Sequence, residues 1–408
     1  MTLRGQKPIR TGSRCSRWLM NNSPLQNPSL LCETTWREID LSAIGSNFRA
    51  IRGAIGPNTK IFACLKQDAY GCGAGKVASI LSAAGVDAFG VVSIADALAV
   101  RKAAPRKPIL MYPGIGPSAV GLVRDLDLTI SISGEEDLAS WLSIGAPLKV
   151  FVKVDLGFWR AGVAPSNLRR LMDLCTSHSN VTVDGLYAHL SELGDAGSST
   201  LTQVARLTPH LAGLKAEGRL PATVMVSSSE SLLNHPEFDM DAVDPGALLF
   251  GLTRSRTGRR ILPIRPALSA IKARIVALKT GHDSMGAPPD LPGYHPDMRL
   301  AVLGIGWGHG IPRRLGSSAS VLVRERRAPI VPPIHLEHLR IDVTDIPEAA
   351  LGDEAVLLGS SGADRITLPE LAEAWNTDET GVSCGLRESL RRIDVAQIET
   401  EPRRRGIT

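Results

Sequence analysis

A lysine that directly follows an apolar run is the residue of this sequence best placed to do chemistry. The run Ile61–Leu65 has the length and composition of a buried strand, and Lys66 follows it, ahead of a glycine-rich segment. Burying an ammonium group is costly unless the amine is paired, deprotonated or covalently bonded. The ordinary alternative is a lysine that reaches from the strand end into water. Lys66 is therefore a candidate for acid/base or covalent chemistry.

Other polar residues stand beside later apolar runs of the chain. They are Lys153, His189, Ser228, Ser229 and Asp244. Taken singly, each has an ordinary structural explanation, such as a helix N-cap for the serines. They become a joint site only if the runs are parallel strands whose carboxyl ends meet.

The elements that must position these residues alternate regularly. Eight apolar runs are separated by helix-compatible segments, and the runs are Ile61–Leu65, Ala88–Val92, Ile109–Tyr112, Leu128–Ile132, Leu148–Val154, Val183–Ala188, Val224–Val226 and Ala247–Phe250. This alternation predicts an α/β fold, a TIM-like (β/α)8 barrel. In such a barrel the loops after the strands surround one mouth, so the polar residues above are expected to share a pocket.

The rest of the chain predicts two further parts. After about residue 265, short strand-like runs separated by Pro and Gly favour a C-terminal β domain at 266–400. The barrel is expected at 33–265, with its first strand joining the β domain. Residues 1–32 carry basic residues and no acid or apolar period, which predicts a disordered extension or a start placed too far upstream.

Composition excludes several classes of protein. The net charge of +5 over 408 residues is small and spread out, so we expect no nucleic-acid partner. No run approaches the roughly twenty apolar residues that span a bilayer, so we expect no membrane partner. The six cysteines form no CxxC pair, which favours reduced thiols and a cytoplasmic location. The two histidines of His335-Leu-Glu-His338 lack a catalytic zinc spacing, so no metal site is expected.

Several separated motifs, between about Thr34 and Ile393, resemble the alanine racemase family. Lys66-Gln-Asp-Ala-Tyr70-Gly-Cys-Gly73 is similar to the family's pyridoxal-phosphate lysine motif. The other matching segments are Val152–Gly162, which is similar to K-x-D-T-G-M-x-R-x-G, Gly185–His189, which is similar to G-x-x-x-H, and, in the C-terminal part, Asp342–Pro347 and Gly352–Gly359.

The resemblance implies a cofactor, pyridoxal 5'-phosphate (PLP), and a role for each matched residue. Lys66 binds the cofactor covalently and then works as an acid/base. The implied cofactor contacts are Tyr70, Lys153, Arg160, His189, Ser228, Ser229, Asp244, Gly246 and Ala247. Arg160 and Leu336 are implied to contact the amino-acid substrate. The family also implies a homodimer with shared active sites, in which the loop carrying Trp307 comes from the partner.

The sequence departs from the family's pattern inside the implied site. Trp307 stands where the family has a tyrosine, its second base, so His309 becomes the candidate for that role. Asp244 stands where the family has an arginine. Three functions therefore stay open: a racemase of alanine or a related small amino acid that uses Lys66 and His309, a PLP-dependent lyase catalysing retro-aldol cleavage or β-elimination, and a non-catalytic PLP carrier.

Overall fold

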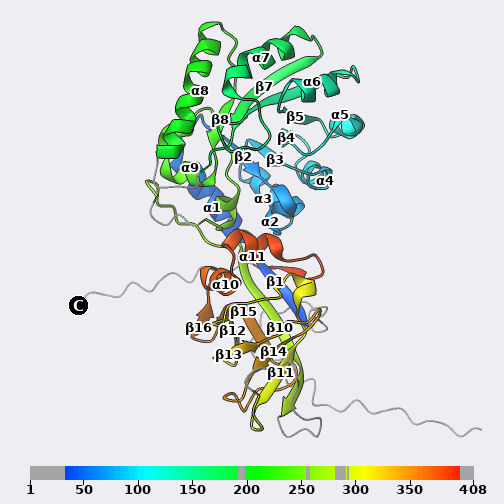
Figure 1. Cartoon of the computed structure of the whole chain (residues 1–408), viewed down its shortest axis with the longest axis vertical. Helices are drawn as coiled ribbons and strands as arrows, with labels where there is room; N and C mark the ends of the chain where they lie inside the picture. Colours follow the sequence, from blue (N-terminus) through cyan, green and yellow to red (C-terminus); the bar gives the residue numbers. More distant parts are fainter. Residues whose placement is uncertain (1–32, 192–197, 254–257, 281–290, 292–293, 396–408) are drawn as a thin grey trace, which may run out of the picture.

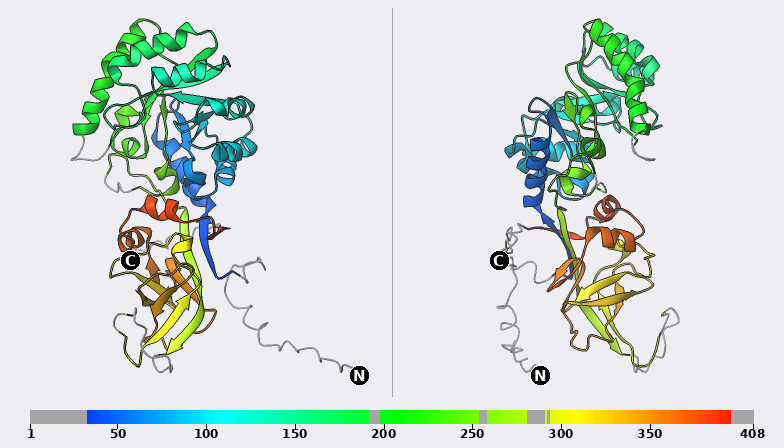
Figure 2. Two further views of the ribbon diagram at one scale, coloured as in Figure 1. Left: turned by 45° about the vertical axis from the view of Figure 1, so that its right-hand side comes forward. Right: turned by 90° about the vertical axis from the view of Figure 1, so that its left-hand side faces the viewer.

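The computed structural model of the chain describes residues 33–191, 198–253, 258–280, 291 and 294–395. A part made of helices and short strands lies at one end of the molecule and a strand-rich part at the other, with helix α11 (Glu379–Gly385) between them (Figures 1 and 2). The extension predicted at 1–32 lies outside the described residues.

The first part is a closed barrel in which every pair of neighbouring strands is parallel, which confirms the predicted fold class. Its strands are β2 (Lys60–Cys64), β3 (Ala88–Val91), β4 (Ile109–Met111), β5 (Leu128–Ile132), β6 (Leu148–Val154), β7 (Val181–Ala188), β8 (Val224–Ser227) and β9 (Ala242–Val243).

Helices precede and follow these strands and cover the barrel (Figure 1). They are α1 (Leu41–Ala54), α2 (Lys66–Tyr70), α3 (Ala74–Ala83), α4 (Ile94–Ala103), α5 (Val120–Asp125), α6 (Glu135–Leu142), α7 (Leu168–Ser177), α8 (Ser198–Ala216) and α9 (Ser229–Asn234). Helix α1 shows why such segments fold: Asp40 accepts hydrogen bonds from the amides of Ser42 and Ala43, and the helix buries an apolar face.

The prediction of an eighth strand at Ala247–Phe250 is wrong. That segment forms the 3-10 helix η6, and the last barrel strand is the earlier segment β9. Because Pro245 has no N–H group to donate to a ladder, the strand ends before it. Asp244 therefore follows the last strand instead of preceding it and lies at the carboxyl end of the barrel with the other polar residues.

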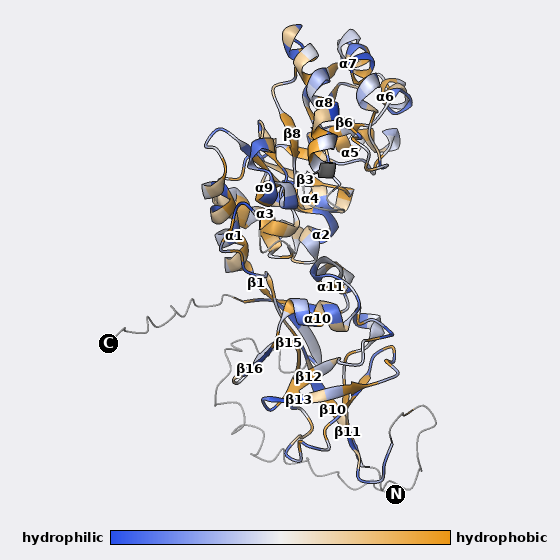
Figure 3. Cartoon of the chain, turned by 60° about the vertical axis from the view of Figure 1, so that its left-hand side comes forward, coloured by the Kyte–Doolittle hydropathy of each residue, from blue (hydrophilic) through white to orange (hydrophobic). Residues whose placement is uncertain are grey.

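The interior of the barrel is filled with side chains. A cluster of buried residues takes members from most of its strands: Phe62, Ala88, Leu110, Phe151, Tyr187, Met225 and Ala242. The packing is close, since a Cβ atom on Gly185 would lie 2.2 Å from the ring of Phe151. Strand β8 is correspondingly orange, the hydrophobic end of the scale, in Figure 3. The interior thus forms a floor beneath the mouth of the barrel.

The second part is built on one sheet, with strand order β16-β15-β12-β13-β14-β11-β10-β1-β17 in the described residues. The strands are β1 (Thr35–Asp40), β10 (Leu268–Thr280), β11 (Arg299–Leu303), β12 (Ser320–Val323), β13 (Arg326–Val331), β14 (Leu339–Asp342), β15 (Glu354–Ser361), β16 (Asp364–Ile366) and β17 (Arg391–Val395). Strand β15 also pairs with β10, so the sheet closes on itself. Helices α10 (Leu368–Ala374) and α11 follow.

Strand β1 pairs with β10, so the described chain runs from the sheet at residue 35 into the barrel. The predicted boundary near residue 265 stays a prediction. Contacts beside Lys66 join the parts: the Ser383 hydroxyl donates to the carbonyl of Tyr70 at 2.7 Å, and Arg392 pairs with Asp68 at 2.7 Å and donates to the carbonyl of Gly71 at 3.2 Å. No helix among the described residues is long and apolar enough to cross a bilayer.

Candidate active site

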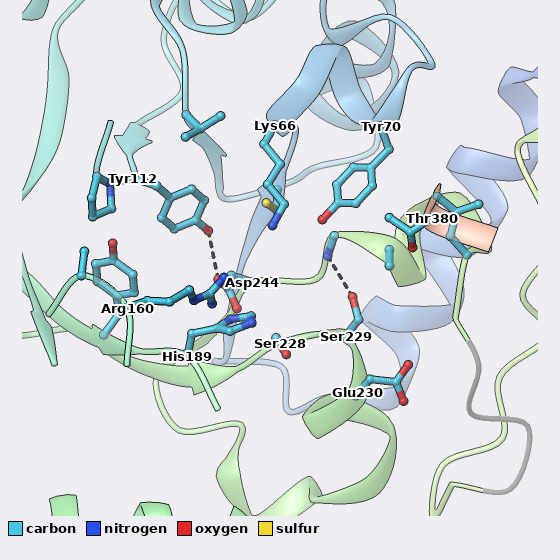
Figure 4. Close-up of a pocket in the computed structure, with 18 of the residues that line it drawn as sticks. Lys66, Tyr70, Tyr112, Arg160, His189, Ser228, Ser229, Glu230, Asp244 and Thr380 are labelled. Carbon is cyan, nitrogen blue, oxygen red and sulfur yellow. Dashed lines mark hydrogen bonds between the residues drawn. The ribbon is translucent and has the colours of Figure 1, made fainter. Parts of the chain in front are cut away.

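A cavity of about 580 Å³ opens at the carboxyl ends of the barrel strands. This volume lies in the usual range for small-ligand sites. Ten of the predicted site residues line it: Lys66, Tyr70, Lys153, Arg160, His189, Ser228, Ser229, Asp244, Gly246 and Ala247. Figure 4 shows many of these side chains pointing into a common space. The sequence motifs, which are up to 181 residues apart, therefore meet in one place.

Lys66 enters the cavity from an unusual turn. The four residues after it, Gln67 to Tyr70, have φ angles between 52° and 55°, a left-handed conformation that costs about 1–2 kcal/mol per residue for side chains other than glycine. Hydrogen bonds offset part of this cost, among them those from Ala74 to Asp68 and from Ser383 to Tyr70. The Lys66 amine lies 5.7 Å from the Tyr70 ring centre and forms neither a hydrogen bond nor an ion pair with any described residue.

The loops after β8 and β9 form a cluster of hydrogen-bond donors opposite Lys66. The Ser229 hydroxyl accepts hydrogen bonds from the amides of Gly246 and Leu248, at 3.0 and 3.1 Å. The amide of Ala247 makes no hydrogen bond with any residue that the structure describes. Position 246 favours glycine, because a Cβ atom there would lie 2.2 Å from the Tyr70 hydroxyl. Together these groups make a small cradle for an anion.

A buried carboxyl lies at the base of the cavity. Asp244 is 8% exposed, and its Oδ2 accepts a hydrogen bond from the Tyr112 hydroxyl at 3.0 Å (Figure 4). Its Oδ1 has no hydrogen-bond partner among the described residues. Burial raises the pKa of Asp244 to about 7, although the Tyr112 hydrogen bond and the charge of Lys66 oppose the shift.

Cations gather on the side of His189. Burial, with the charges of Arg160, Lys66 and Lys153, lowers the pKa of His189 to about 3, so its imidazole is neutral at physiological pH. Burial and the nearby Arg160 also lower the pKa of Lys153. The Arg160 guanidinium stacks on Phe158, 3.9 Å from the ring centre. This side of the cavity therefore favours anionic groups.

Several lining residues were not predicted as site residues. They include Tyr112, Tyr187, Glu230, Asp378 and Glu379. Tyr112 ends a predicted strand, so its position carried a usable signal. The last two belong to the start of α11 and its cap, more than 300 residues after Lys66, where no strand pattern points to the barrel mouth.

Trp307, His309 and Leu336 do not line the cavity. They form a second cluster in the strand-rich part, where the amide of Trp307 donates to the carbonyl of His335 and that of Gly308 to the carbonyl of Leu336. His309 Nδ1 accepts from the amide of Gly306 at 3.1 Å, which leaves Nε2 as the protonated nitrogen of the neutral ring. Leu336 is 50% exposed. One chain therefore holds the predicted site residues in two separate groups.

Comparison with known protein families identifies both parts of this chain. A model described as the alanine racemase N-terminal domain matches residues 39–254, and one described as the C-terminal domain matches residues 293–394. The chain belongs to the alanine racemase family.

Individual alanine racemases are similar over nearly the whole described chain. That of Halothermothrix orenii is 32% identical over 365 residues, which cover 88% of this chain and 96% of that protein. That of Symbiobacterium thermophilum is 32% identical over 371 residues, with 88% and 96% covered. The structure of the Bacillus anthracis alanine racemase with bound L-Ala-P has a TM-score of 0.80 at 26% identity, and the match covers 89% of this chain and 95% of that one.

Alanine racemases depend on PLP, so this chain is a PLP-dependent amino-acid racemase, and the comparisons give the lyase alternative no support. The cavity fits the cofactor on structural grounds. It has an amine without a counter-ion at Lys66, an anion cradle at Ser229 and Gly246, and an unpartnered buried oxygen on Asp244 that can accept from a ring nitrogen.

Proposed function

We propose that this protein interconverts L- and D-alanine with PLP held in the barrel cavity. The observation that carries the proposal is the unpaired Lys66 amine in the same cavity as the Ser229 and Gly246 cradle. A reactive amine and an anion site at the two ends of one pocket are what a phosphorylated aldehyde requires. The names of the relatives support alanine as the substrate.

The residues divide the work of holding the cofactor. Lys66 would bond it covalently, while Ser228, Ser229 and the amides of Gly246 and Ala247 would hold its phosphate near Tyr70. His189, neutral because its pKa is low, would pack against the ring without adding charge. Lys153 and Arg160 would serve its phenolic oxygen. When bound, PLP withdraws electrons from the amino acid and makes its α-proton acidic.

Racemisation moves a proton at the α-carbon from one face to the other. We assign one face to Lys66, whose amine forms neither a hydrogen bond nor an ion pair with any described residue and so would be available to exchange a proton at the α-carbon. Arg160, which is exposed at the mouth, is positioned to bind the substrate carboxylate. The substrate would then be held with its α-proton toward the lysine.

We assign the second face to His309 of a partner subunit. An imidazole ring can both take up and release a proton, which the indole of Trp307 cannot. Burial lowers the pKa of His309, which favours its neutral form. Trp307 has a structural role instead. The guanidinium groups of Arg313 and Arg387 lie over its ring, 5.3 and 5.9 Å from the ring centre, as cation–π contacts. Because the loop does not line the cavity of its own chain, we propose a homodimer in which it completes the partner's cavity and brings Leu336 to the substrate.

We also propose a cytoplasmic location. The four cysteines that the structure describes, Cys64, Cys72, Cys175 and Cys384, are all free. Free thiols agree with a reducing compartment.

Proton exchange in deuterated water tests the proposed reaction. Each enantiomer of alanine is incubated with the holoenzyme, and α-deuteration, the other enantiomer and any keto product are measured. We expect deuterium at the α-carbon of both enantiomers, no side product, and loss of both signals in Lys66→Ala. Release of pyruvate and ammonia as the main outcome would contradict a racemase.

Mixed dimers test the shared site. Lys66→Ala and His309→Asn are each expected to be inactive, and asparagine keeps an acceptor for the Gly306 amide without an exchangeable ring proton. After random subunit exchange, half of the dimers carry one intact site of two, so activity should return to about a quarter of wild type. The control is Lys66→Ala mixed with the double variant Lys66→Ala/His309→Asn. It should stay inactive, because no subunit then carries Lys66. No recovery in the first mixture would contradict the dimer proposal.

A further inference from the structure

A carboxyl group in the cavity is satisfied on one oxygen only. Asp244 is buried, its Oδ2 is held by Tyr112 at 3.0 Å, and its Oδ1 has no partner among the described residues. A buried acceptor without a donor destabilises the folded protein by about 1–3 kcal/mol. A ligand that donates a hydrogen bond to Oδ1 would remove this cost. Lys66 and Lys153 line the same cavity and act on Asp244 through their charges.

The chain holds this carboxyl in place from several sides. Its backbone amide donates to the carbonyl of Ser227 at 2.9 Å, which ties the end of β9 to β8. Tyr112 reaches it only because position 90 is glycine, where a Cβ atom would lie 2.6 Å from the Tyr112 hydroxyl. Tyr112 packs on Tyr187 at 5.7 Å between ring centres, and the hydroxyl of Tyr187 hydrogen-bonds to Ser131 at 2.7 Å. The Tyr112–Asp244 pair is therefore a fixed acceptor.

The Tyr112 hydrogen bond has a definite electrostatic effect. A hydroxyl that donates to a carboxylate stabilises the charged form. Burial acts in the opposite direction and raises the pKa of Asp244 to about 7. A cationic donor at Oδ1 would tip this balance toward the carboxylate, because a charge pair in a buried site is strong once both hydrogen bonds are made.

We propose that Oδ1 of Asp244 accepts a hydrogen bond from the protonated ring nitrogen of bound PLP, and that Tyr112 is the positioning residue that keeps the carboxylate charged. This inference rests on the proposed function, since it needs PLP in this cavity. The arginine that the family has at this position is always protonated and would leave the ring nitrogen without a proton. This chain therefore runs its reaction on a ring that withdraws electrons more strongly.

The ¹⁵N chemical shift of ring-labelled PLP in the holoenzyme tests this directly. We expect the shift of a protonated ring nitrogen in the wild type at neutral pH. Asp244→Asn should give the unprotonated shift, because its amide can donate to the nitrogen. Tyr112→Phe should give a shift between the two, since the carboxyl without its donor holds the proton more tightly. Ser140→Ala, on the exposed face of α6 and away from the cavity, is the control and should match the wild type.

The outcomes separate this inference from the proposed function. An unprotonated nitrogen in a wild-type enzyme that racemises alanine overturns the inference and leaves the function standing. A wild-type protein that binds no PLP overturns both. If Asp244→Asn does not fold, the Tyr112→Phe variant decides. A ¹⁵N shift equal to that of the wild type would mean that the tyrosine does not act through the carboxylate, and the inference would fail.

Discussion

The hydroxyl of Ser229 accepts a hydrogen bond from the backbone amide of Gly246 at 3.0 Å and so ties the loop after β9 to the start of α9. Ser229→Ala should weaken PLP binding about ten- to hundredfold, since a hydrogen bond to a charged group contributes about 1.5–3 kcal/mol. Titration of the apoenzyme with PLP, followed by absorbance, measures this. Ser140→Ala, on the exposed face of α6, is the control. Equal PLP affinity in both variants would exclude Ser229 from the phosphate site.

The close approach of Gly246 to Tyr70 predicts a coupled pair of substitutions. A Cβ atom at position 246 would lie 2.2 Å from the Tyr70 hydroxyl and 3.0 Å from the nearest ring carbon, so Gly246→Ala should destabilise the protein by about 1–3 kcal/mol. Tyr70→Phe removes the nearest atom. The double variant should therefore be more stable than the sum of the single changes predicts, by at least about 0.5 kcal/mol, in urea unfolding of the apoenzyme. Strict additivity would mean that the two residues do not meet.

Much of the site could be predicted from the sequence because its residues follow buried strands. Lys66 and His189 each come directly after an apolar run, and a parallel barrel gathers such positions at one mouth. The prediction failed at β9, because a strand of two residues leaves no pattern and the apolar segment Ala247–Phe250 resembled a strand more closely. Asp378 and Glu379, at the start of α11, could not be found from the strand pattern, since only tertiary packing brings them to the cavity.

The low pKa of His189 predicts how stability depends on pH. The folded protein keeps this imidazole neutral down to a pKa of about 3, whereas the unfolded chain protonates it near 6.5. The unfolded state thus binds more protons between these values, so stability falls as the pH decreases through that window. His189→Gln should reduce this pH-dependent loss of unfolding free energy by at most about 1.4 kcal/mol per pH unit. Urea unfolding of both apoproteins at pH values across the window checks this, and parallel stability curves would contradict it.

Mapping the covalent attachment of PLP tests the account most directly. The holoenzyme is reduced with borohydride and digested, and the peptide that carries the added cofactor is sequenced by mass spectrometry. The account predicts that the cofactor is on Lys66 and that Lys66→Ala shows neither the adduct nor the visible absorbance of bound PLP. An adduct on Lys153 or any other lysine of the wild type, with Lys66 unmodified, would contradict it.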